Sequence, residues 1–125
     1  MKLIQIYHAV PAMRKLAAAD GIPGKQLFAL FRLTDRVEKE AEIFRAASIK
    51  VYNECGTAEG KTYRVTPGRE NELAARLAEI GEAEVDGIRE ITIDYRESMN
   101  LSVNDIAALK GIVRINLNEQ EKEEG

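Results

Sequence analysis

The residues that could do nucleophilic chemistry are few, and no pattern in the sequence brings them together. The chain has one histidine, His8, and one cysteine, Cys55. A thiol acts as a nucleophile beside a base that is itself held in place, and nothing near either residue supplies such an arrangement. We interpret Cys55 as a buried, inert thiol and His8 as a residue at the boundary of a helix. A Cys–His pair remains the alternative.

Acidic residues are plentiful, but they fall on faces that we expect to be solvated. Three pairs stand out: Glu38 with Glu42, Glu70 with Glu72, and Glu90 with Asp94. None of them has a histidine or cysteine at the spacing of metal ligands, and their solvated faces argue against both a metal site and a glycosidase-type site. We therefore predict no catalytic residue, no metal site and no cofactor, and a protein that is not an enzyme.

One glycine-rich string resembles a phosphate-binding loop. It reads Gly56-Thr57-Ala58-Glu59-Gly60-Lys61-Thr62. A P-loop has four residues between its glycines and joins a strand to a helix, whereas this string has three and follows a predicted helix. We interpret the string as a turn that leads into a strand.

The elements that position these residues are organised around one long predicted helix, from Pro23 to Cys55. Its apolar side recurs at steps of three and four residues: Leu27, Leu30, Leu33, Val37, Ala41, Phe44, Ser48, Val51, Tyr52 and Cys55. Pro23 suits a first helical turn, and Gly56 is expected to end the helix in the left-handed conformation. The opposite side carries charged residues from Arg32 to Glu42.

Shorter elements precede and follow this helix. The β-rich segment Leu3–Tyr7 predicts a strand, and Ala9–Asp20 predicts a helix with Pro11 in its first turn. The tight linker 21–24 predicts that the latter packs on the long helix as a helical hairpin. Downstream we expect a strand at Lys61–Thr66, a helix from Pro67 to Gly81, a strand at Ile88–Tyr95, a helix capped by Ser102 and Asp105, and a strand at Ile112–Leu117.

These expectations combine into an α+β fold. It consists of a helical hairpin with one long helix, packed with short helices and a small, mainly antiparallel sheet. The 125 residues suit one domain, which we place at residues 1–117. Residues 118–125 are rich in glutamate, and we expect an acidic, disordered tail.

Composition limits the class of partner. The net charge of −3 argues against a dedicated nucleic-acid binder. Basic residues that could gather at one end lack interleaved aromatic residues: Arg14, Lys15, Lys25, Arg32, Arg36 and Arg64. No apolar run reaches the length of a membrane span, so we predict a cytoplasmic protein without a membrane partner.

Four apolar residues of the long helix point away from its apolar side: Phe28, Phe31, Ile43 and Ile49. Leaving a large apolar side chain in water forfeits about 1.5–3 kcal/mol. A second copy of the chain is the most available cover, so these four are our interface candidates in a predicted homo-oligomer. The alternative is a monomer whose sheet folds back over them.

The order of elements resembles small, uncharacterised proteins encoded by tailed bacteriophages and prophages. The likeness lies in the charged helix from Arg36 through Phe44 to Gly56, then in the strand around Arg64, an acidic helix, the strand Ile88–Tyr95 and the segment Leu101–Leu109. The chain departs from that pattern in its β-rich start and in Cys55, where such helices tend to end in an aromatic residue and glycine. The resemblance implies a phage origin and no activity.

Together these points give two hypotheses of function. The first is a non-enzymatic phage or prophage protein that acts through protein–protein contacts, as an assembly or interaction module in the host cytoplasm. The alternative is a small regulator or inhibitor of a host nucleic-acid machine, contacting nucleic acid through the end that carries Arg14, Lys15 and Lys25.

Overall fold

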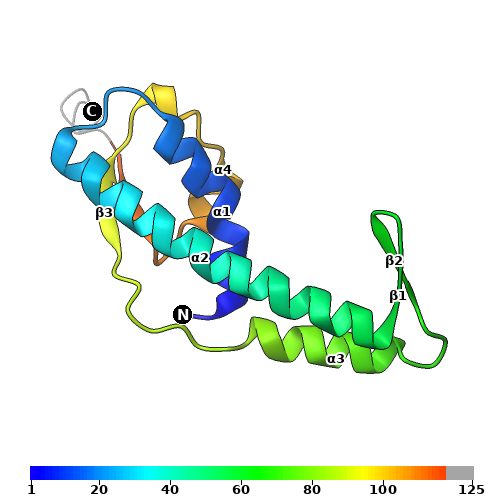
Figure 1. Cartoon of the computed structure of the whole chain (residues 1–125). Coiled ribbons are helices and arrows are strands. Elements are labelled where there is room, and N and C mark those ends of the chain that lie inside the picture. The colour runs from blue at the N-terminus through cyan, green and yellow to red at the C-terminus, as the bar shows by residue number, and fades with distance from the viewer. Residues whose placement is uncertain (118–125) are drawn as a thin grey trace.

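The computed structural model describes residues 1–117, so the expected acidic tail at 118–125 lies outside the described residues. The elements follow one another along the chain (Figure 1): α1 (Leu3–Ala18), α2 (Gly24–Cys55), β1 (Gly56–Glu59), β2 (Thr62–Val65), α3 (Glu70–Gly81), β3 (Ile91–Asp94), the 3-10 helix η1 (Glu97–Met99), α4 (Val103–Ala108) and β4 (Val113–Asn116). The predicted α+β class, led by one long helix, is confirmed.

Helix α2 is the axis of the molecule: α1 and α3 lie along it, and the β1–β2 hairpin projects from its end (Figure 1). Helix α1 packs on its first half as the predicted hairpin, and α3 packs on its second half. The interior is therefore divided. A large core surrounds Met13, Leu30 and Ile93 at one end, and a small core is built on Val51 and Leu73 at the other.

The predicted strand at Leu3–Tyr7 is wrong, because these residues form the first turns of α1. The buried positions Leu3, Ile6, Val10 and Met13 follow one another at three and four residues, which is a helical spacing. Five residues are too few to separate that spacing from the alternation of a strand. Tertiary packing on α2 then decides the outcome against the strand preference of isoleucine.

Pro11 consequently lies inside α1 and not in its first turn. A proline there removes the N–H that would bond to the carbonyl of Tyr7, four residues earlier. Both Pro11 and Tyr7 lie on the exposed side of the helix, where water can bond to that carbonyl.

Gly56 also differs from its expectation. Its φ is −167°, which is extended backbone and not the left-handed conformation. The residue starts β1, which pairs with β2 in an antiparallel hairpin through a tight turn at Gly60. A glycine is needed here because a Cβ at Gly56 would collide with the carbonyl oxygen of Arg64.

The strands form two separate sheets where one was expected. β1 and β2 are antiparallel, but β3 and β4 are parallel, with Ile91 opposite Val113 and Ile93 opposite Ile115. The parallel pairing requires a crossover, which η1 and α4 provide. The predicted cap of α4 is confirmed, since Asp105 N–H donates to Ser102 Oγ at 3.0 Å and Ser102 N–H donates to Asp105 Oδ2 at 2.9 Å.

The close approach at Gly56 can be tested by Gly56→Ala. The added methyl group collides with β2 and must push the hairpin away from the end of α2. We expect a loss of about 1–3 kcal/mol in the free energy of unfolding, the usual cost of overpacking, measured by urea denaturation. The matched control is Gly24→Ala, where a Cβ meets nothing within 4 Å. Equal stabilities of the two variants would contradict the close approach.

Candidate functional site

The structure does not bring the single histidine and the single cysteine together. His8 is exposed on α1, in the middle of the helix and not at its boundary as predicted, because α1 begins at Leu3. Cys55 is fully buried at the end of α2, as predicted. His8 lines a groove together with four residues of α2, of which Arg45 is the nearest to Cys55. Arg45 precedes Cys55 by ten residues, which is about 15 Å along the helix. A Cys–His pair therefore has no geometric support.

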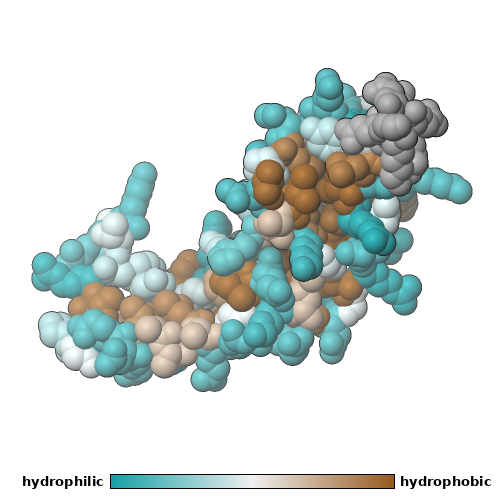
Figure 2. Space-filling model, turned by 180° about the vertical axis from the view of Figure 1, so that it is seen from behind, coloured by the Kyte–Doolittle hydropathy of each residue, from teal (hydrophilic) through white to brown (hydrophobic). Residues whose placement is uncertain are grey.

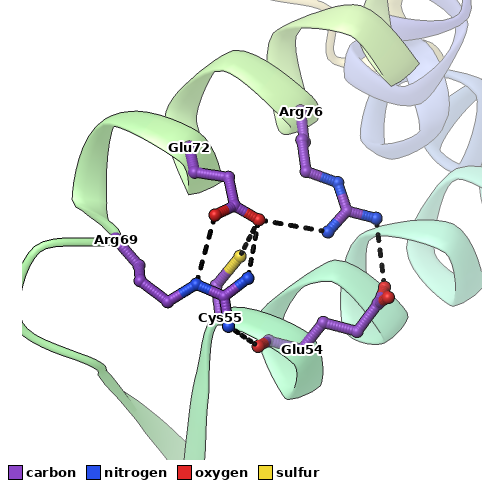
Figure 3. A network of polar contacts seen from close by, with 5 residues as sticks. All are labelled: Glu54, Cys55, Arg69, Glu72 and Arg76. Atoms are coloured by element: carbon purple, nitrogen blue, oxygen red, sulfur yellow. Dashed lines mark hydrogen bonds and ion pairs between the residues drawn. The ribbon is translucent and has the colours of Figure 1, made fainter.

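Cys55 belongs to a polar network that joins the end of α2 to the start of α3 (Figure 3). Its thiol donates to Glu72 Oε2 at 3.6 Å. The same carboxylate accepts from Arg69, through Nη2 at 2.7 Å and Nε at 3.2 Å. Arg69 also donates through Nη1 to the backbone carbonyl of Glu54 at 2.6 Å. This last bond caps one of the carbonyls that a helix end leaves without a partner.

A second arginine completes the network. Arg76 Nη2 donates to Glu54 Oε2 at 3.1 Å, and Arg76 Nη1 lies 3.7 Å from Glu72 Oε2. Hydrogen bonding to Arg69 is the main cause that holds the pKa of Glu72 below its ordinary value. The network contains no imidazole that could take the thiol proton, and every group drawn in Figure 3 has a partner. Its chemistry is that of a clamp between two helices.

A groove between α1 and α2 holds the histidine. It has a volume of about 310 Å³, and its walls include His8, Pro11, Glu38 and Glu42. The two carboxylates lie in ion pairs, Glu38 with Arg14 at 2.7 Å and Glu42 with Arg45 at 3.5 Å. Within residues 1–117, no group of three or more His, Cys, Asp or Glu side chains is placed to hold a metal ion.

The six basic residues do not gather at one end, because Arg64 lies on the β1–β2 hairpin, at the far end of α2 from Lys25 (Figure 1). Three of them are engaged by carboxylates: Arg14 with Glu38, Lys15 with Asp105, and Arg64 with Glu59. Arg36 also lies 3.8 Å from Glu40 Oε1. Together with Arg32 and with Arg89 from the linker that follows α3, it lines a depression of about 410 Å³, whose wall also includes Asp35. Arg89 could not be predicted as a member of this group, because only the path of the linker after α3 brings it beside α2.

The four interface candidates are all exposed, and neither sheet covers them. Phe28, Phe31 and Ile43 expose more than half of their surface, and Ile49 exposes 41%. Phe28 and Phe31 lie one turn apart, and the guanidinium of Arg32 lies 5.7 Å from the centre of the Phe28 ring. Charged residues separate this pair from the two isoleucines. The structure therefore presents two apolar spots on α2 and not one continuous stripe.

Comparisons with protein-family models, with curated proteins and with solved structures find no match to this chain. The phage origin therefore stays a hypothesis that rests on the sequence pattern. In the part of the chain that the structure describes, no helix combines the length and apolar character needed to cross a membrane.

The clamp around Glu72 predicts a pH dependence of stability. A carboxyl whose pKa is lowered by folding stabilises the folded state above its unfolded pKa, near 4.5, and this contribution is lost as the pH falls through the folded pKa. Glu72→Gln should therefore be less stable than the wild type at pH 7, with a difference that shrinks by pH 3.

Urea denaturation at both pH values measures the effect. Glu79→Gln is the matched control, since Glu79 is exposed on α3 and forms no ion pair within residues 1–117. A Glu72→Gln curve that parallels the wild type from pH 7 to pH 3 would contradict the role of the carboxylate.

Proposed function

We propose that the protein is a non-enzymatic interaction module that binds proteins through the outer face of α2. On the sequence resemblance we assign it to a phage or prophage, acting in the cytoplasm of the host. The observation that carries the proposal is the exposure of Phe28, Phe31, Ile43 and Ile49 on a helix whose other outward residues are mostly charged. Exposed apolar patches that are surrounded by polar residues are typical of protein–protein contact sites.

The spacing of the two apolar spots favours an elongated partner. Phe28 and Ile49 are 21 residues apart in one helix, which is about 30 Å. A second α2 laid antiparallel would place the phenylalanines of one copy beside the isoleucines of the other, so that one two-fold axis covers both spots. A homo-oligomer is therefore the first partner that we propose, and a phage or host protein with a similar helix is the next.

This contact can be tested with Phe31→Glu, which puts a charge in one spot without touching either core. We expect the wild type to show a mass above that of one chain in size exclusion with light scattering at micromolar concentration. The dissociation constant of the variant should be about tenfold higher or more, because the contact would desolvate a carboxylate.

The matched control is Asn71→Glu, which adds the same charge at an exposed position of α3. A wild type with the mass of a single chain would remove the self-association through α2. A variant that behaves as the wild type would place the contact elsewhere.

The second candidate function is a small regulator or inhibitor of a host nucleic-acid machine. The depression formed by Arg32, Arg36 and Arg89 favours it, because arginine binds phosphate with several N–H donors. Arg36 is held there by a 2.7 Å bond from its Nη2 to the carbonyl of Asp86. Phe28 and Phe31 lie on the same helix, where bases could stack.

Binding of a fluorescent single-stranded oligonucleotide tests this candidate. If Arg89 contacts a phosphate, Arg89→Gln should weaken binding and lower the salt slope by about 1. Arg64→Gln serves as the control, because Arg64 lies on the hairpin and is paired with Glu59 at 3.2 Å. Absence of binding at low salt would remove the candidate.

A further inference from the structure

Within residues 1–117, the parallel pair β3–β4 has one edge that contacts α2 and one edge with which no other strand pairs. On β3, the Asp94 N–H donates to Gln26 Oε1 of α2 at 3.4 Å. Two bonds from β3 show which groups of β4 face it. Ile91 N–H donates to the carbonyl of Ile112 at 3.1 Å, and Tyr95 N–H donates to the carbonyl of Asn116 at 2.9 Å. Alternate residues of a strand bond to opposite sides. The N–H and C=O groups of Ile115 therefore point away from β3.

Within residues 1–117, no hydrogen bond reaches these outward groups of Ile115. The N–H of Leu117 follows the same alternation and also has no partner there. The outward N–H of Val113 is the exception, because it donates to the carbonyl of Leu109 at 2.9 Å. Among the described residues, β4 thus has four unbonded groups at three positions in register: Val113 C=O, Ile115 N–H and C=O, and Leu117 N–H.

Apolar surface surrounds this edge. Seen from behind, apolar side chains gather at the end of the molecule that carries β3, α4 and β4 (Figure 2). Val103 is 83% exposed and Leu117 57%, and Ile106 is also exposed. A depression of about 370 Å³ lies between the last part of α4 and β4, with Ile106 and Ile115 in its lining. An open strand edge beside apolar surface is the arrangement that accepts an added strand.

We propose that β4 pairs with β4 of a second copy of this chain, antiparallel and centred on Ile115. The strand is complementary to itself in this register. The two Ile115 residues exchange both hydrogen bonds, and the Leu117 N–H of one copy meets the Val113 C=O of the other, which is the group left free there.

The side chains agree with the same register. Val113 lies opposite Leu117 of the other copy and Ile115 opposite Ile115, so that apolar residues meet on one face. Arg114 meets Asn116 on the other face, without a pair of like charges. A two-fold contact gives hydrogen-bond partners to the outward groups of both β4 strands at once. An unrelated peptide would need a matching series of N–H, C=O and apolar side chains.

The test uses the full chain carrying Phe31→Glu, so that any contact through α2 is removed. Sedimentation equilibrium of this variant up to several hundred micromolar should show a monomer–dimer equilibrium. Adding Leu117→Pro should weaken that dimer about tenfold or more, because two hydrogen bonds per dimer lose their donor. Leu117→Val keeps the N–H and should dimerise as before.

Leu117 is exposed and its N–H does not bond to β3, so an unchanged circular dichroism spectrum is expected for both substitutions. Hydrogen exchange gives a second readout, since the Ile115 amide should exchange more slowly as the protein concentration rises.

Three results would overturn the inference: a Phe31→Glu chain that stays monomeric, a dimer indifferent to Leu117→Pro, or an Ile115 amide whose exchange does not depend on concentration. If the wild type self-associates but the Phe31→Glu chain stays monomeric, the contact through α2 is supported and the one through β4 is not. A wild-type dimer lost with Leu117→Pro and kept with Phe31→Glu would support the β4 contact and remove the one through α2.

Discussion

The constraint on which the structure depends is the length of α2. This helix has 32 residues, whereas α1 has 16 and α3 has 12, so that only the two short helices end to end can cover its apolar side. One core cannot extend over about 48 Å in a chain of this size. The interior therefore divides into a large core and a small one, and the linker after α3 must run back along α2 to reach β3 (Figure 1).

The division explains where polar contacts gather. The small core rests on three buried residues, Val51, Cys55 and Leu73, and so gains little from apolar burial. The clamp of Arg69, Glu72 and Arg76 lies at this end, where it caps α2 and fixes the direction of α3. A single exposed ion pair adds little stability, but here two arginines and two glutamates are joined in one network, which contributes more than an isolated pair.

The sequence predicted what depends on local spacing and missed what depends on tertiary contacts. α2 was clear because its apolar period repeats over many turns, and the cap of α4 was clear because Ser102 and Asp105 bond within one turn. Leu3–Tyr7 was too short to show a period. The parallel pairing of β3 with β4, the clamp around Cys55 and the place of Arg89 all join residues whose separation in the sequence carries no signal.

The surface that remains follows from the same constraint. Charged side chains join neighbouring elements, as in the pairs Arg14–Glu38 and Lys15–Asp105, while large apolar side chains stay exposed on α2, on α4 and after β4. Burial of apolar groups supplies most of the stability of a fold, so these exposed side chains add little to that of the described chain. Within residues 1–117, α1 and α3 leave Phe28, Phe31, Ile43 and Ile49 of α2 uncovered, and the interaction module proposed above rests on this exposed surface.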